Sequence, residues 1–312
     1  MRVVHISQTP VAGACHLWSQ AFREAGYTSC SIARKNYGDG RLFHSDYNWP
    51  PKAPAITQIQ LADVIFCHQG QAYKYAWYPK GKPTVGIYHS QPDHVYRKLE
   101  ADGWPWAVMG QYQPRLYPGC RIVPNLLPLQ SPHFQPRTKA PGIRIAYSPS
   151  NTTSTGWDDK GYEKTVAVLK RVVGQDGIGC EADIITHVCH EECLARKAVA
   201  HIVIDECATG SYHRSSLEGL ALGYVVVNGC DDRCIGNIGT MTGGCGHPFI
   251  LSSLDALEDC LADLIEDGRY KLAAAGMSNR RWAECAWNPA ELINRNIKPL
   301  IDEAMAQCEP AC

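Results

Sequence analysis

The segment from residue 204 to residue 229, IDECATGSYHRSSLEGLALGYVVVNG, restricts the fold of this chain more than any other part of the sequence. Apolar residues recur at helical spacing between residues 217 and 221, and Gly223 stands where such a helix would end. Residues 224–227 are a largely β-branched run that is typical of a buried parallel strand. The segment therefore predicts a helix between two strands, which is the repeating unit of an α/β fold.

The loop before this helix carries an unusual set of polar residues: Tyr212, His213, Arg214, Ser215 and Ser216. Hydroxyls, an imidazole and a guanidinium beside the N–H groups of a helix start favour a phosphate-bearing ligand. Glu218, one turn into the helix, is placed to accept hydrogen bonds from a ribose diol. The alternative is a capped helix behind a solvated loop, so the prediction depends on other motifs.

Strands and helices alternate in the same way along the rest of the chain. Further strands are expected at residues 2–7, 29–33, 62–67, 84–88, 144–147 and 182–186. Five prolines between Pro124 and Pro141 mark a linker. We predict two parallel α/β domains, over residues 1–135 and 136–292, with a ligand cleft between them. A C-terminal helix over 293–312 is expected to pack back toward the first domain.

Composition argues against a membrane or secreted protein. The 312 residues are 45% apolar and 20% charged, as in globular proteins, and no apolar run approaches the roughly 20 residues that span a bilayer. The chain begins directly in a strand without a signal-peptide pattern. Its 15 cysteines are odd in number and scattered, which favours reduced thiols. We therefore expect a cytoplasmic protein.

One group of soft ligands has the composition of a tetrahedral zinc site: Cys230, Cys234, Cys245 and His247. Its spacing matches no standard zinc finger. We therefore expect no metal there and keep a structural zinc ion as the alternative.

Five motifs follow one another over about residues 1–295: ADVIFCH, PTVGIYHS, VPN, YSPS followed by KG, and SLEGLALGYVVVNG. In this order they resemble the retaining, nucleotide-sugar-dependent glycosyltransferases of the glycogen-synthase-like group. That family has the GT-B architecture, in which two Rossmann-like domains face each other. The compact motifs are similar to those of phage-type members, which implies a bacterial or phage-infected cell.

The resemblance implies roles for individual residues. The donor, expected to be a UDP-sugar, would be bound through its diphosphate and ribose by Ser148, Ser150, Lys160, Tyr212, His213, Arg214, Ser215, Ser216 and Glu218. The candidate catalytic residues are His89, His213 and Lys160, with His89 facing the donor sugar. The acceptor side of the first domain would contain Gly13, His68, Gln69, Tyr88 and Ser90. The chain has no Asp-x-Asp motif, and no catalytic metal or further cofactor is expected.

The sequence departs from the family at one position. The family places a glutamate eight residues before the one that matches Glu218, and this chain has Gly210 there. His213, Arg214 or Glu206 are the candidates to replace it, and the sequence does not distinguish them.

The charge distribution suggests the acceptor. Residues 1–139 contain 15 Lys and Arg against 7 Asp and Glu, whereas residues 140–312 contain 15 against 24. The stretch QAYKYAWYPKGK in the basic half interleaves aromatic rings with lysines, a pattern that suits nucleic acid. We predict a hydroxymethylated pyrimidine base in DNA as the acceptor, flipped out of the duplex. A glycan, a lipid-linked sugar or a protein is the alternative acceptor, and a non-catalytic nucleotide- or sugar-binding module is the alternative of another class.

Overall fold

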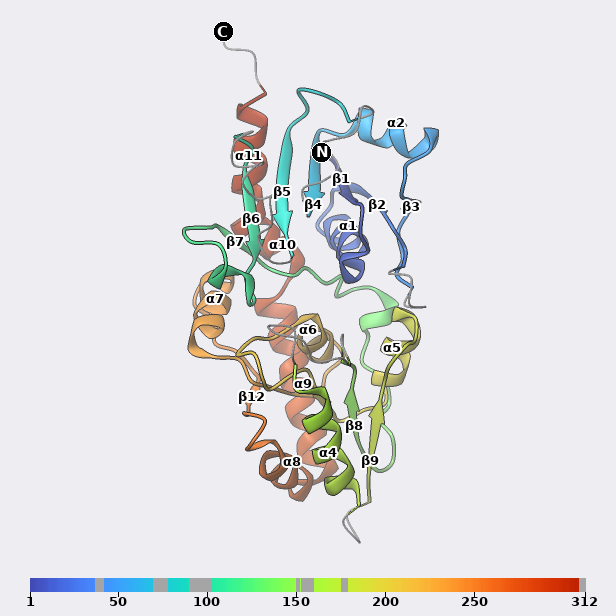
Figure 1. The fold of residues 1–312 in the computed structure, drawn as a ribbon, viewed down its shortest axis with the longest axis vertical. Coiled ribbons are helices and arrows are strands. Elements are labelled where there is room, and N and C mark those ends of the chain that lie inside the picture. Colours follow the sequence, from blue (N-terminus) through green and yellow to red (C-terminus); the bar gives the residue numbers. More distant parts are fainter. Residues whose placement is uncertain are drawn as a thin grey trace. The chain divides into compact units, whose positions relative to one another are not determined.

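The computed structural model describes residues 1–36, 42–69, 78–89, 103–149, 152, 160–174 and 179–308. The chain divides into two compact units, and Figure 1 labels most of their helices and strands. Unit 1 comprises Met1–Pro128 and Asn288–Cys312, and unit 2 comprises Leu129–Trp287. The chain passes from unit 1 to unit 2 within the proline-rich segment 124–141.

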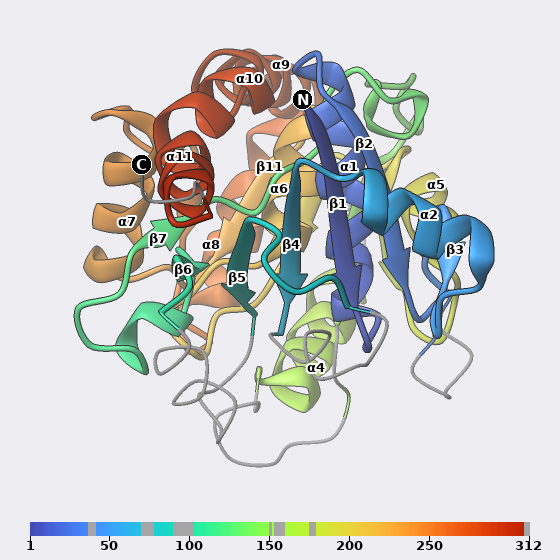
Figure 2. The ribbon, with the colours of Figure 1, turned by 90° about the horizontal axis from the view of Figure 1, so that it is seen from above.

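Unit 1 contains a parallel sheet with the strand order β3-β2-β1-β4-β5-β6-β7. Its strands are β1 Arg2–Ser7, β2 Thr28–Ala33, β3 Tyr47–Asn48, β4 Val64–His68, β5 Thr84–Tyr88, β6 Trp106–Met109 and β7 Ile122–Val123. Its helices are α1 Ala14–Glu24, α2 Ala53–Leu61, α10 Pro289–Leu292 and α11 Lys298–Ala306, the last two joined by a π-helical turn, Ile293–Ile297. Figure 2 shows β1, β4 and β5 side by side in this sheet.

Alternation along the strands gives the sheet of unit 1 two differently packed faces. On one face, Val4 and Ile65 pack in a cluster with Ile59 of α2. On the other, the rings of His5 and Phe66 contact Trp18 of α1, at centroid distances of 5.9 Å in both cases. A polar residue on the second face is therefore enclosed between the sheet and α1.

Unit 2 contains a second parallel sheet, with the order β12-β11-β10-β8-β9. Its strands are β8 Ile143–Tyr147, β9 Cys180–Ile184, β10 Ile202–Ile204, β11 Val225–Asn228 and β12 Ile250–Leu251. Its helices are α4 Tyr162–Val173, α5 His190–Lys197, α6 Arg214–Ala221, α7 Asp232–Thr242, α8 Leu257–Glu266 and α9 Gly268–Ala286.

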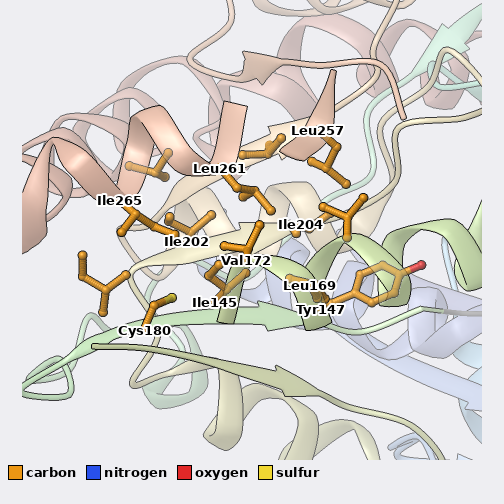
Figure 3. Packing of buried hydrophobic residues seen from close by; sticks show 14 of the residues in the cluster. Ile145, Tyr147, Leu169, Val172, Cys180, Ile202, Ile204, Leu257, Leu261 and Ile265 are labelled. Carbon is orange, nitrogen blue, oxygen red and sulfur yellow. The ribbon is translucent and has the colours of Figure 1, made fainter. Parts of the chain in front are cut away.

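The core of unit 2 lies between this sheet and helices α4 and α8. Figure 3 shows Ile145 and Ile204 of the strands meeting Leu169 of α4 and Leu261 of α8. The opposite face is covered by α6, which contacts β10, β11 and α9. Because α6 follows β10 directly in the chain, its first turn lies at the carboxyl edge of the sheet.

The prediction of an α/β fold with two Rossmann-like halves is confirmed. The amphipathic pattern of α4 predicts its observed bounds, Tyr162–Val173. Helix α7 lies in the segment that the sequence presents as a cysteine cluster, and its two interior glycines conceal the helical pattern. Its start is stabilised by Asp231, whose side chain accepts a hydrogen bond from the Cys234 N–H. Among the described residues, no helix combines the length and the apolar character needed to cross a bilayer.

Helix α9 crosses the turn between α6 and β11 at a glycine, and this contact gives a stability prediction. A Cβ at Gly276 would overlap the Gly223 carbonyl oxygen and lie 2.9 Å from the Gly223 carbonyl carbon. Since both obstacles are backbone atoms, no rotamer relieves the clash. We expect Gly276→Ala to lower the free energy of unfolding by about 2–4 kcal/mol in chemical denaturation.

Gly239 supplies the matched control for this substitution. It also lies within a helix, α7, and a Cβ there meets nothing within 4 Å. Gly239→Ala should therefore leave stability unchanged or raise it by up to about 1 kcal/mol. Equal effects of the two substitutions would contradict close packing at Gly276.

Candidate functional site

The candidate site of unit 2 forms at the carboxyl edge of its sheet. Tyr147 of β8 and Ile204 of β10 are paired in register, so the next residues, Ser148 and Asp205, emerge at the same edge. The first turn of α6 begins there with Arg214. Two of these three chain segments, the end of β8 and the start of α6, are ones in which the sequence predicts donor-binding residues.

Glu218 is the centre of this site. Its side chain is 3% exposed and contacts three basic side chains. Lys197 Nζ donates to Oε2 at 2.8 Å, and Arg214 Nε donates to Oε1 at 2.9 Å. His190 Nε2 lies 2.8 Å from the same Oε1. Both carboxylate oxygens of Glu218 are therefore engaged by groups of the protein itself.

The charges of this cluster do not cancel. Burial raises the pKa of Glu218, but the charges of Lys197 and His190 outweigh it and hold that pKa well below its usual range. Burial lowers the pKa of Lys197, but the opposing effect of the neighbouring Cys193 and Glu218 is larger. The pKa of Lys197 is therefore raised above its usual value. The pKa of His190 is lowered, mainly by burial. Two permanent cations, Lys197 and Arg214, thus surround one carboxylate and leave an excess positive charge.

Two hydroxyls extend this cluster toward β8. Ser215 Oγ accepts a hydrogen bond from Lys197 Nζ at 2.9 Å, and it lies 3.2 Å from Ser148 Oγ. Because Ser215 accepts from the lysine, its own hydroxyl proton is directed elsewhere, to Ser148 or to a ligand. The Ser215 hydroxyl is therefore a polarised hydrogen-bond donor beside Lys197 and Arg214.

Asp205 stabilises the start of α6 from the end of β10. Its Oδ2 accepts hydrogen bonds from the His213 N–H at 2.5 Å and from Ser216 Oγ at 2.8 Å. Burial raises the pKa of Asp205, but His213, Ser216 and the charge of Lys160 bring it down to about 2. The helix start therefore already holds one carboxylate, which the sequence pattern did not reveal.

The predicted donor-binding side chains divide into two groups. Ser148, Ser215, Arg214 and Glu218 converge, as described above, and Lys160 lies close enough to Asp205 to lower the pKa of its carboxyl. Tyr212 and Ser216 are instead fully buried. The Tyr212 ring packs against Phe249 and Trp287, and Ser216 accepts from Asn228. Ser150 lies outside the described residues.

The three candidates to replace the family glutamate at Gly210 have different surroundings. Glu206 is 1% exposed and accepts from the N–H groups of Ala208 and Thr209, so it holds its own turn together. Arg214 is paired with Glu218. His213 has a side chain that is 24% exposed, with Nδ1 3.6 Å from an Asp205 oxygen. Of the three, His213 is the one whose Nδ1 makes no hydrogen bond among the described residues, although its backbone N–H donates to Asp205.

In unit 1, three histidines form a chain of contacts: His5 and His68 belong to β1 and β4, and His89 directly follows β5. His5 Nδ1 lies 3.2 Å from His68 Nε2, and His68 Nδ1 lies 2.8 Å from His89 Nε2. His5 and His68 are 0% and 1% exposed, and His89 is half-buried. We call this set the histidine chain. Its backbone is held by Gln69, whose Oε1 accepts from the His89 N–H at 3.0 Å.

Burial keeps the inner part of the histidine chain neutral. It lowers the pKa of His5 to about 3, with smaller and opposed contributions from Asp46 and Arg23. It also lowers the pKa of His68 well below the usual range, and the neighbouring His89 and His5 add to this effect.

Two other predicted acceptor-side residues, Tyr88 and Gly13, have contacts with residues outside the histidine chain. Tyr88 points to the opposite face of the sheet, where it is 3% exposed and stacks on Tyr117 at 5.5 Å. Gly13 lies in the turn between β1 and α1 with a φ of 81°, and a Cβ there would lie 3.0 Å from Phe43. Ser90 lies outside the described residues.

The alternative of a structural zinc site is not supported by the arrangement of its ligands. Cys230, Cys234, Cys245 and His247 all belong to the described residues, within which no three His, Cys, Asp or Glu side chains gather as a metal site requires. Cys230 and Cys234 are buried, whereas Cys245 is exposed. Cys230 and Cys234 lie at the start of α7, whereas Cys245 and His247 follow its end, so the helix separates the two pairs.

Four residues of these sites were not found from the sequence: His5, His190, Lys197 and Asp205. His5 offered the best signal, because it is a polar residue in an otherwise apolar strand, VVHIS. Asp205 directly follows a buried strand, a position that often carries site residues. Lys197 gave no signal, since the segment HEECLARK has the pattern of an exposed helix end, yet Lys197 is 1% exposed.

No protein-family model and no curated protein sequence matches this chain. Solved structures do match it along nearly the whole length. A sucrose-phosphate synthase from Thermosynechococcus elongatus is 13% identical with a TM-score of 0.58, covering 98% of this chain and 100% of its own. AviGT4, a glycosyltransferase involved in avilamycin A biosynthesis, is 14% identical with a TM-score of 0.56, covering 98% of both chains. A glycosyltransferase from Rickettsia africae is 11% identical with a TM-score of 0.54, covering 98% and 97%.

These likenesses establish the fold. The chain has the two-domain α/β fold of GT-B glycosyltransferases, and the predicted resemblance is confirmed at that level. The narrower resemblance to phage-type members stays a prediction.

Proposed function

We propose that this chain is a retaining glycosyltransferase that moves a sugar from a nucleotide-sugar donor to an acceptor hydroxyl. The observation that carries the proposal is the cluster of Lys197, Arg214 and Ser215 around Glu218. It lies at the carboxyl edge of a parallel sheet, where α/β proteins bind nucleotides. The chain also has the fold of glycosyltransferases over nearly its whole length.

The proposed chemistry is stabilisation of the leaving nucleotide. When the bond between the sugar and the diphosphate breaks, negative charge develops on the phosphate oxygen that leaves. Arg214 and Lys160 would neutralise that charge directly, and Ser148 and Ser215 would donate hydrogen bonds. Lys197 is too deeply buried for direct contact, so it acts through Ser215 and through its charge. We assign the contact with the transferred sugar to His89 and His213.

Glu218 has a different part in this proposal from the one that the resemblance implies. Its two oxygens already accept from Lys197 and Arg214, with His190 beside them. A carboxylate has about four acceptor positions, so one remains for a ribose hydroxyl. We propose that the main role of Glu218 is to position Lys197 and Arg214, and that binding the ribose is its second role.

The test of the donor site compares two lysines of one segment. We expect the purified protein to hydrolyse or transfer from at least one nucleotide sugar in a panel that includes UDP-glucose. Lys160→Ala should lower turnover by about 10²–10³-fold, more than it weakens donor binding, because its charge acts mainly in the transition state.

Lys164 is the matched control for Lys160. It lies four residues further on, is exposed on α4, and should leave turnover within about twofold when changed to alanine. Product released with inverted anomeric configuration, measured by NMR, would contradict the retaining assignment.

For the acceptor we propose a hydroxymethylated pyrimidine base in DNA. The support is the basic N-terminal half, with 15 Lys and Arg against 7 Asp and Glu over residues 1–139. Residues 71–77 of the aromatic and lysine stretch, which spans residues 71–82, lie outside the described residues. The test is incubation of the donor panel with DNA containing hydroxymethylcytosine or hydroxymethyluracil, followed by mass analysis of nucleosides. An unchanged nucleoside profile with every active donor would direct the search to glycans, lipid-linked sugars and proteins.

A non-catalytic nucleotide-sugar-binding module is the second candidate. Two observations favour it, namely glycine at position 210 and the engagement of both Glu218 oxygens by the protein. Calorimetric binding of a nucleotide sugar without hydrolysis or transfer to any acceptor would select this candidate.

A further inference from the structure

The histidine chain has a direction, because each of its two contacts holds a single proton. His5 and His68 are buried and neutral, so each carries one ring proton. If His5 donates from Nδ1, then His68 accepts at Nε2 and donates from Nδ1 to His89 Nε2. If the direction is reversed, His89 donates from Nε2 and the proton of His5 is on its own Nε2. The tautomers of the three rings are therefore coupled.

The surroundings of His5, at the inner end of the histidine chain, distinguish the two directions. His5 Nε2 is buried and has no hydrogen-bond partner among the described residues. Its ring lies among aromatic side chains, stacked on Phe66 at 5.1 Å and edge-on to Phe22 at 5.0 Å. The reversed direction would leave an N–H there without an acceptor, and such orphaned donors are rarer in proteins than under-satisfied acceptors.

We propose that His5 and His68 fix the tautomer of His89, with the proton of the neutral His89 ring on Nδ1 and its Nε2 accepting from His68. His5 and His68 are then positioning residues, since they act on His89 and not on a ligand. His89 Nδ1 is a hydrogen-bond donor in this state, so it is suited to hold a hydroxyl or carbonyl oxygen and not to remove a proton. The use of that donor in sugar transfer rests on the proposed function, whereas the tautomer does not.

The direct test is the ring ¹⁵N spectrum of the full-length protein labelled at its 12 histidines. The signals of His89 are assigned by their loss in His89→Asn. At neutral pH we expect the protonated form at Nδ1 to exceed that at Nε2 by at least about tenfold. A predominance of the Nε2 proton, or near-equal populations, would overturn the proposal without any variant being needed.

His5→Asn tests the role of His5 itself. The asparagine amide reaches the place of the His5 Nδ1 and either donates or accepts, so it no longer imposes a direction. We expect the two His89 tautomers to come within about threefold of each other in this variant. His44→Asn, at an exposed histidine of the same unit, should leave the His89 signals unchanged. Unaltered His89 signals in His5→Asn would refute coupling along the chain.

The result is separable from the test of the proposed function. A protein with the Nδ1 tautomer but no turnover with any donor would retain this inference and contradict the glycosyltransferase proposal. A protein that turns over donors with His89 in the Nε2 tautomer would do the reverse.

Discussion

Glu218→Ala is expected to lower the free energy of unfolding by about 3–5 kcal/mol, measured by chemical denaturation at neutral pH. The reason is that Lys197, the buried partner of Glu218, remains in the variant. Lys197 is 1% exposed, and without Glu218 its ammonium would be a buried cation whose one remaining acceptor, within the part of the chain that the structure describes, is the neutral Ser215 hydroxyl. Arg214 would lose its hydrogen bond to Glu218 as well. Donor affinity should fall with stability, because the cations are no longer held in place.

Two further variants separate the charge from the packing. Replacing the pair together, as Glu218→Leu with Lys197→Met, should leave stability within about 2 kcal/mol of the parent, because the fully buried lysine cation is removed with its partner. Arg214, whose side chain is 14% exposed, still loses its contact with Glu218 in this variant. Glu163→Ala, at an exposed glutamate of α4 in the same unit, should change it by less than about 0.5 kcal/mol. A loss below about 1 kcal/mol for Glu218→Ala would mean that Lys197 reaches water when Glu218 is absent.

Acid is expected to destabilise unit 1 steeply, and well before its carboxylates titrate. The pKa of His5 is about 3 in the folded chain, and that of His68 is far below the usual range, whereas in the unfolded chain both are near 6.5. The unfolded state therefore binds these protons first as the pH falls. Stability is fully present above about pH 6.5 and declines below it, by about 1.4 kcal/mol per pH unit for each group.

The measurement is the free energy of unfolding between pH 7 and pH 4, followed by tryptophan fluorescence, which reports on Trp18 beside His5. His5→Phe removes one of the two groups and should reduce the slope by about 1.4 kcal/mol per pH unit. His44→Gln, at an exposed histidine of unit 1, should leave the slope as it is. An unchanged slope in His5→Phe would mean that His5 is already protonated in the folded state.

The predictability of the candidate sites depended on whether their residues are neighbours in the chain. Ser215 and Glu218 belong to one short helix. The pattern of residues 204–229 therefore predicted both residues, and also that their helix follows a strand. Tyr212 and Ser216 belong to the same segment, but the sequence did not show that they turn into the core. The direction of a side chain at a helix start depends on what packs behind it.

Alternation of strands and helices, read from apolar periodicity, was enough to determine the α/β class, the two Rossmann-like halves and the helix that carries Glu218. This was possible because periodicity is a local property of the chain. Only the tertiary structure decided that Lys197 turns inward to Glu218, and that His5, His68 and His89 form one chain. Those contacts join residues 21 to 63 positions apart, and they depend on the order of strands in a sheet and on burial, which no local pattern contains.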